Sequence, residues 1–161
     1  MPPSAATDKN PQAGYASIAV VGAGAWGTAL AIVAAGNTAK VVLWARENEI
    51  VESLAAAREN AIFLPGVRVP PNIEATSNLA RAADAEAVLL VAPAQHVRAV
   101  LAALRPVLKA KVPVVLCAKG IETGTGLLLN EVLAELLPDA EPAILSGPSF
   151  AIEVARRHPT A

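Results

Sequence analysis

Short apolar segments alternate with longer helix-forming segments along most of this chain. The short segments are nearly continuous runs of valine, leucine, isoleucine and alanine, which is the pattern of parallel strands buried on both faces. The longer segments are rich in alanine or carry apolar residues three and four positions apart, which predicts helices. We expect strands at residues 18–21, 41–44, 73–75, 87–91, 112–118 and 143–145, and helices at 25–35, 47–58, 97–108, 127–137 and 150–157.

This alternation predicts an α/β fold: a Rossmann-like, mostly parallel, doubly wound sheet with helices on both faces. Residues 60–72 interrupt the pattern, because they are rich in proline, too irregular for a helix or a strand, and long for an ordinary loop. Residues 1–16 contain proline, alanine and polar side chains and are expected to form a flexible leader. Residues 17–161 are expected to form one domain.

The composition excludes several classes of partner. Hydrophobic residues make up 54% of the 161 residues and charged residues 17%, a balance that argues against disorder. The net charge is −1, and its 13 basic side chains are spread along the chain, so no basic patch for nucleic acid or a membrane surface is expected. No apolar segment approaches the ~20 residues of a membrane-spanning helix, and the N-terminus lacks the apolar core of a signal peptide.

The single cysteine, Cys117, lies in the apolar run V-V-L-C-A. One cysteine cannot form an intrachain disulfide, which favours a reducing, cytoplasmic setting. We interpret Cys117 as a small buried hydrophobe. The sequence indicates no metal site.

The strongest chemical signal is the segment G-A-G-A-W-G, in which Gly22, Gly24 and Gly27 match G-x-G-x-x-G. It directly follows a predicted strand and precedes a predicted helix, the context in which this motif binds a dinucleotide. Gly22 allows a tight turn, Gly24 lets the backbone approach a pyrophosphate, and Gly27 lets the helix pack closely on the strand. The helix beginning near Ala25 directs its N–H groups at the phosphates, and Trp26 is expected at the edge of the ligand. We therefore predict a nicotinamide cofactor.

The end of the second strand bears on the choice of cofactor. In NAD-binding proteins an acidic residue is expected ~20 residues beyond the glycine loop, at the end of this strand. It is not cleanly present here, because the strand ends in W-A-R-E, with Arg46 before Glu47. A guanidinium can hold a 2′-phosphate bidentately, which favours NADP(H). Glu47 leaves NAD(H) open, as does the alternative that Arg46 is an exposed charge at the end of the strand.

Beyond the glycine loop, several segments occur in a characteristic order. They are N-A-I-F-L-P-G at 60–66, P-P-N-I-E-A-T at 70–76, V-A-P-A-Q at 91–95, A-K-G-I-E at 118–122 and L-S-G-P-S-F-A-I-E-V-A at 145–155. With them the chain resembles bacterial-type NAD(P)-dependent glycerol-3-phosphate dehydrogenase from about residue 17 to its end.

The resemblance implies reversible hydride transfer between the cofactor and dihydroxyacetone phosphate or sn-glycerol 3-phosphate, supplying glycerol 3-phosphate for phospholipid synthesis. It implies that Lys119 lies beside both nicotinamide and substrate, where an ammonium stabilises the charge that develops on a reduced carbonyl. Gly147 and Ser149 are implied as substrate contacts, and Pro93 and Ala151 as residues on the cofactor side. From the residues alone, Lys119 could be a surface lysine, and S-G-P-S a turn that caps a helix.

The resemblance also implies a second, helical domain that supplies the general acid/base lysine and most of the grip on the substrate phosphate. The chain ends where that domain is expected to begin, so we expect it to bind cofactor but to be inactive alone. A homodimer of the full-length protein is compatible with the resemblance. His96 is interpreted as a polar residue at a helix start, and His158 is assigned no role.

Three alternatives remain open at this stage. A ketopantoate-reductase-like or 3-hydroxyacid-dehydrogenase-like enzyme would suit the glycine loop and Arg46 equally, but the K-G-I-E and S-G-P-S-F-A segments argue against both. A non-catalytic domain that senses NAD(H) would need neither Lys119 nor the substrate loop. A Rossmann-like methyltransferase is less compatible with three well-spaced glycines.

Overall fold

Six parallel strands form the central sheet of the computed structural model, which describes residues 14–160. Their order in the sheet is β5-β2-β1-β6-β7-β8, the order of the Rossmann dinucleotide-binding fold. The predicted fold class is therefore confirmed. The strands are β1 (Ser17–Val21), β2 (Lys40–Trp44), β5 (Ile73–Thr76), β6 (Ala87–Leu90), β7 (Pro113–Leu116) and β8 (Glu141–Ile144).

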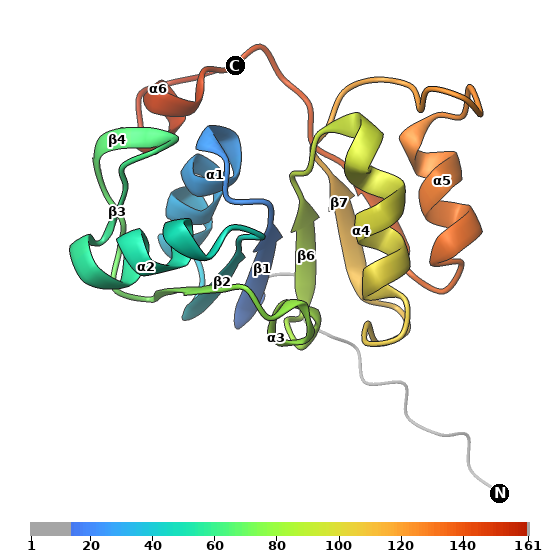
Figure 1. Cartoon of the computed structure of the whole chain (residues 1–161), viewed down its shortest axis with the longest axis horizontal. Coiled ribbons are helices and arrows are strands. Elements are labelled where there is room, and N and C mark those ends of the chain that lie inside the picture. The colour runs from blue at the N-terminus through green and yellow to red at the C-terminus, as the bar shows by residue number, and fades with distance from the viewer. Residues whose placement is uncertain (1–13, 161) are drawn as a thin grey trace, which may run out of the picture.

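Helices cover both faces of this sheet. Apolar side chains of α3, α4 and α5 pack on one face, and those of α1, α2 and α6 pack on the other. Figure 1 shows α1 and α6 together on one side of the molecule, and α4 and α5 on the other. The helices are α1 (Ala25–Ala35), α2 (Asn48–Ala57), α3 (Leu79–Ala83), the 3₁₀ turn η1 (Ala94–His96), α4 (Val97–Leu104), α5 (Leu129–Leu136) and α6 (Ala151–Ala155).

The burial of β1 explains why it has no polar position after Ser17. Ala19 and Val21 face the α3–α5 side, whereas Val20 faces the α1 side, and all three are fully buried. Successive strand residues point to opposite faces, so a strand covered on both faces is apolar throughout.

The prediction that residues 60–72 are irregular is wrong for the first half of this segment. A hairpin forms there from β3 (Glu59–Asn60) and β4 (Leu64–Arg68), which pair antiparallel with a shift in register between Glu59 and Asn60. The pattern concealed it because β3 has only two residues and β4 contains Pro65 and Gly66, so neither has the alternation of an ordinary strand.

Several element boundaries also differ from the predictions. Helix α3 was not predicted; it has five residues, and the side chain of Asn78 caps its N-terminus by accepting a bond from the amide of Ala80. Helix α4 ends at Leu104, four residues earlier than expected, because Pro106 has no N–H with which to continue a helix. Strand β8 begins at Glu141 and all its residues are exposed, which is why it has no clear apolar run.

The expected leader lies mostly outside the described residues, which begin at Gly14. The backbone of Ala16 is held by two bonds: its amide donates to the carboxylate of Glu86, and its carbonyl accepts from the amide of Lys40. Within residues 14–160, no helix combines the length and the apolar character needed to cross a membrane.

Candidate active site

The glycine loop between β1 and α1 requires glycine at two positions, at Gly22 for its backbone conformation and at Gly22 and Gly27 for lack of space. Gly22 has a φ of +121°, and a Cβ there would lie 2.7 Å from the carbonyl oxygen of Val91. A Cβ on Gly27 would lie 1.7 Å from the carbonyl oxygen of Gly22. A Cβ on Gly24 would meet no atom within 4 Å, so this position faces open space. The loop is thus closed on its protein side and open on its outer side.

The N-terminus of α1 presents free backbone N–H groups. Gly24 is the N-cap residue, it provides no side-chain cap, and no acidic residue stands in the first turn of this helix. The first intrahelical bond runs from the amide of Thr28 to the carbonyl of Gly24, at 2.9 Å. The amides of Ala25, Trp26 and Gly27 therefore have no partner within the helix, and they lie at its positive end.

A cleft of about 670 Å³ opens beside this loop, at the carboxyl ends of the parallel strands. Ligands of open α/β sheets bind in this region, where the strand order reverses. Residues that follow β1, β2, β6 and β7 all line it. Eight residues predicted to contact the cofactor are among them: Gly22, Gly24, Ala25, Trp26, Gly27, Arg46, Pro93 and Lys119.

An ion pair lies at the end of β2 on the wall of this cleft. The Nε of Arg46 is 3.1 Å from a carboxylate oxygen of Glu47, and the two side chains are 76% and 48% exposed. This contact uses the Nε only, and among residues 14–160 neither Nη group of Arg46 has a hydrogen-bond or ion-pair partner. They are thus available to an anion that enters the cleft.

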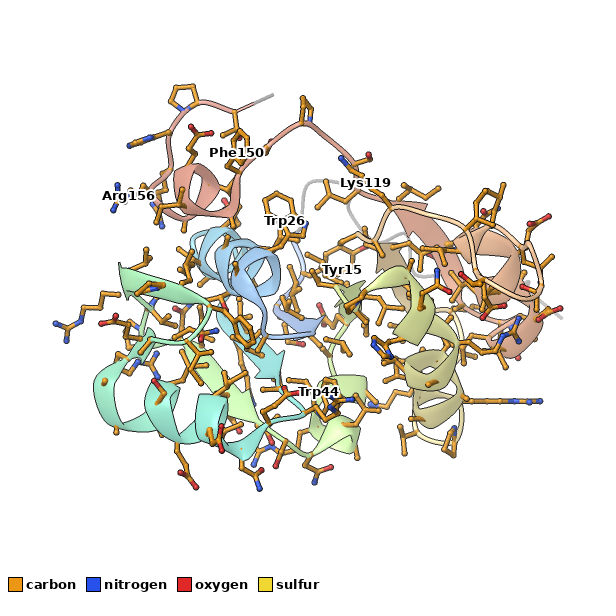
Figure 2. All side chains as sticks on the ribbon, turned by 45° about the horizontal axis from the view of Figure 1, so that its top comes forward. Tyr15, Trp26, Trp44, Lys119, Phe150 and Arg156 are labelled. Atoms are coloured by element: carbon orange, nitrogen blue, oxygen red, sulfur yellow. The ribbon has the colours of Figure 1, made fainter. Side chains whose placement is uncertain are left out.

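A second hollow of about 240 Å³ adjoins the first, and Trp26, Cys117 and Lys119 line both. The ammonium of Lys119 donates a bond of 2.8 Å to the carbonyl of Gly147, which lines the second hollow together with Ser149. The structure thus brings together the three residues predicted to contact substrate. In Figure 2, Trp26 on α1 and Lys119 beyond β7 lie at the same end of the molecule.

Three other residues considered from the sequence are Ala151, His96 and His158, and of these only His96 lines a hollow. Ala151 is the first residue of α6, where it packs toward the α1 face of the sheet and lines neither hollow. His96 is the last residue of η1, is exposed and lines the large cleft. His158 is exposed near the end of the chain and lines neither hollow.

A buried carboxylate fixes the loop that follows Lys119. The side chain of Glu122, on a residue that is only 8% exposed, accepts bonds of 2.8 and 2.9 Å from the guanidinium of Arg98 on α4, and one of 2.6 Å from the hydroxyl of Thr125. The bonds from Arg98 and then from Thr125 lower the pKa of Glu122. Arg98 also pairs with Glu135 on α5, at 2.9 Å. The loop is thereby tied to two helices.

A glutamine holds the same loop from the cofactor side. The side-chain amide of Gln95 donates to the carbonyl of Ile121 at 2.9 Å and accepts from the amide of Thr123 at 2.8 Å. Gln95 belongs to η1, which follows the cleft residue Pro93 and begins with the cleft residue Ala94. The two loops at the carboxyl edge of β6 and β7 are therefore joined.

Cys117 is buried at the end of β7 and lines both hollows. Burial raises the pKa of its thiol to about 11. The side chain is therefore a neutral thiol at pH 7, as expected of a small buried hydrophobe.

Comparison with known proteins identifies the family. The model of the family "NAD-dependent glycerol-3-phosphate dehydrogenase N-terminus" matches residues 17–161. The chain belongs to this family. A protein named glycerol-3-phosphate dehydrogenase [NAD(P)+] from Parvibaculum lavamentivorans is 60% identical over 147 residues, which are 91% of this chain and 44% of that protein. The chain thus spans about half the length of such relatives.

Solved structures of the family have the same fold. The crystal structure of glycerol-3-phosphate dehydrogenase from Coxiella burnetii superposes on this chain with a TM-score of 0.84 and 36% sequence identity. The match covers 89% of this chain and 44% of the Coxiella chain. The glycerol-3-phosphate dehydrogenase from Saccharomyces cerevisiae superposes with a TM-score of 0.79 and 28% sequence identity, over 88% of this chain and 44% of the yeast chain. Membership of this family decides against the ketopantoate-reductase-like, 3-hydroxyacid-dehydrogenase-like and methyltransferase alternatives.

Sequence reasoning missed the residues that hold the loops of this site in place. Asn60, Gln95, Arg98 and Glu122 were not assigned roles, although three of them lie in or beside segments that carried the resemblance. Phe63, which lines the large cleft, was also missed. No local signal marks the four polar residues, because each has a partner that lies 24 or more positions away in the sequence.

Proposed function

We propose that this chain is the cofactor-binding domain of an oxidoreductase that interconverts dihydroxyacetone phosphate and sn-glycerol 3-phosphate with NAD(P)H. The observation that carries this proposal is the junction of the two hollows. Lys119 lines the dinucleotide-sized cleft beside the glycine loop and bonds to Gly147 in the smaller hollow. A nicotinamide and a small phosphorylated substrate could meet there.

The large cleft fits a dinucleotide. Its volume of about 670 Å³ lies within the range of cofactor sites. The open space at Gly24 and the free amides at residues 25–27 suit a pyrophosphate, which is stabilised by the helix N-terminus. Arg46 would hold a 2′-phosphate through its Nη groups, whereas Glu47 would accept a bond from a 2′-hydroxyl. We therefore propose that the site can take either cofactor and that Arg46 favours NADP(H).

The bound cofactor supplies or accepts a hydride, and the residues of this chain orient the carbonyl that receives it. The Lys119 ammonium has three N–H groups, of which one is bonded to Gly147. The remaining two can bond to the substrate oxygen and stabilise the negative charge that develops there. Gly147 fixes the direction of this ammonium, and Ser149 would contact the substrate beside it. Ala151 lines neither hollow, and its proposed place on the cofactor side rests on the family resemblance alone.

The proton that completes the reaction is proposed to come from a residue outside this chain, in the part of its relatives that the chain does not span. The proposed partners are a small-molecule substrate and, in the full-length protein, a second copy of the same chain, and neither nucleic acid nor a membrane is expected to bind. The free thiol of Cys117 supports a cytoplasmic location, where the product would enter phospholipid synthesis.

Calorimetric titration of the chain with NADPH and NADH tests the cofactor assignment. The proposal expects saturable binding of both, with NADPH the tighter. A protein extended to the length of its relatives should then oxidise NADPH in the presence of dihydroxyacetone phosphate. Absence of cofactor binding would contradict the first part, and cofactor binding without turnover would favour the nucleotide-sensing alternative.

A further inference from the structure

Asn60 is a fully buried polar side chain beside the glycine loop. It stands at the end of β3, and it is one of three buried polar or charged residues among those the structure describes, with Thr28 and Glu122. Burying an amide is unfavourable unless its bonds are made. Its partners therefore indicate what the residue holds in place.

Two partners of Asn60, Ala23 and Phe63, line the cofactor cleft, and the third, Thr28, lies directly after the cleft residue Gly27. Its Nδ2 donates a bond of 2.8 Å to the carbonyl of Ala23, between two glycines of the loop, and another of 2.8 Å to the hydroxyl of Thr28 in the first turn of α1. Its Oδ1 accepts a bond of 3.1 Å from the amide of Phe63. One carboxamide thus joins the glycine loop, the N-terminus of α1 and the β3–β4 turn.

The β3–β4 turn places an aromatic ring at the cleft. Phe63 is 47% exposed and lines the cleft, whereas Leu64, the next residue, is only 4% exposed and packs in the core beside α1. Leu64 anchors the hairpin, and the bond from Asn60 to the Phe63 amide sets the turn that directs the ring outward. A large ring on the wall of a cleft buries apolar ligand surface.

We propose that Asn60 is a positioning residue for cofactor binding, which holds the glycine loop and the ring of Phe63 in their binding geometry. This inference rests on the proposed function, and it adds a residue that acts only through its neighbours. The carboxamide is needed because it donates and accepts at once. A carboxylate would keep the bond from Phe63 but would place an oxygen against the carbonyl of Ala23.

The test compares NADPH affinities of purified variants by calorimetry, with folding checked by circular dichroism. Asn60→Ala and Asn60→Asp should each weaken binding by about tenfold to a hundredfold, because each leaves carbonyl or hydroxyl partners without a donor. The matched control is Asn72→Ala. The side chain of Asn72 also donates to two carbonyls, those of Ala35 and Thr38, but it does not line the cleft. It should lose stability and keep its NADPH affinity within about twofold.

A double-mutant cycle separates positioning from general destabilisation. If Asn60 acts partly through Phe63, the loss caused by Asn60→Ala should be smaller in a Phe63→Ala background than in the wild type. Amide hydrogen exchange should also speed up at residues 23–28 in Asn60→Ala and remain unchanged there in Asn72→Ala.

The binding measurements distinguish failure of the proposed function from failure of the positioning role of Asn60. A wild-type chain that binds neither NADPH nor NADH overturns the proposed function and this inference together. A wild-type chain that binds, with Asn60→Asp and Asn72→Ala equally close to it in affinity, overturns only the inference. If Asn60→Ala does not fold, Thr28→Val decides: it removes one acceptor while keeping the shape of the side chain, and unchanged NADPH affinity in this variant overturns the inference.

Discussion

The ammonium of Lys119 donates a hydrogen bond of 2.8 Å to the carbonyl of Gly147, a residue 28 positions away in the sequence. Lys119 follows β7, and Gly147 follows β8, which pairs with β7 in parallel. Parallel neighbours end at the same edge of the sheet, so the two loops meet there. This bond holds the lysine at the junction of the two hollows, where the proposed reaction requires a positive charge.

Replacement of this lysine should affect chemistry far more than cofactor binding. In a protein extended to the length of its relatives, Lys119→Ala should lower the rate of dihydroxyacetone phosphate reduction by about 10²–10³-fold, the cost of losing one preorganised donor. Affinity for NADPH should change by less than about fivefold. The control is Lys109→Ala, since Lys109 is exposed and pairs with Asp84. Near-normal turnover of Lys119→Ala would make Lys119 a surface residue.

Arg46 should set the preference for the phosphorylated cofactor. Because a hydrogen bond to a charged group contributes roughly 1.5–3 kcal/mol, Arg46→Ala should weaken NADPH binding by about tenfold to a hundredfold and leave NADH binding nearly unchanged. Parallel calorimetric titrations measure both. Arg105→Ala, on the surface beyond α4, should alter neither affinity. Equal losses for the two cofactors in Arg46→Ala would remove the assignment of the 2′-phosphate site.

Alanine substitutions at two glycines of the loop should have different effects, one on folding and the other on cofactor binding. A Cβ at Gly27 would collide with the carbonyl of Gly22, so Gly27→Ala should lower the melting temperature or prevent folding. A Cβ at Gly24 meets open space, so Gly24→Ala should fold normally and lose NADPH affinity, because the methyl group occupies the approach of the pyrophosphate. Thermal melts with and without NADPH check both. A Gly24→Ala variant that binds normally would place the pyrophosphate elsewhere.

Glu122 should make the stability of the domain sensitive to acid. Its pKa in the folded chain is lowered, chiefly by its bonds from Arg98, relative to the ordinary value near 4.3. Its contribution is therefore complete above that ordinary value and is lost as the pH falls through the lower, folded-state pKa. Urea unfolding at pH 7, 5 and 3.5 should show a smaller loss of stability with acid in Glu122→Gln than in the wild type.

The control for this series is Glu52→Gln, since Glu52 is exposed on α2. Its loss of stability with acid should match that of the wild type. If Glu122→Gln and the wild type lose stability in parallel, the ion pair with Arg98 does not carry the pH dependence.

The sheet and the glycine loop could be predicted because their signals are local. Each strand is a short apolar run, and the three glycines stand between a strand and a helix, so their spacing alone fixes the turn. Arg46 could be located because β2 precedes it directly. In each case the residues that define the feature are neighbours in the sequence.

The supports of the site could not be predicted because they depend on distant contacts. Asn60 bonds to residues 37 and 32 positions away, and Arg98 bonds to Glu122, 24 positions away. A buried asparagine and an exposed one look alike in the sequence until the tertiary partners are known. The short hairpin and α3 escaped for a related reason: two to five residues are too few to show a period.

The central claim is that the cleft beside the glycine loop holds the cofactor with its reactive end toward Lys119. Titration of the ¹⁵N-labelled chain with NADPH, followed by NMR, measures this residue by residue. The account predicts large amide shifts at residues 22–28, Arg46 and Lys119, and small ones along α5, which lines neither hollow. Shifts confined to other surfaces, or no shifts at millimolar NADPH, would contradict it.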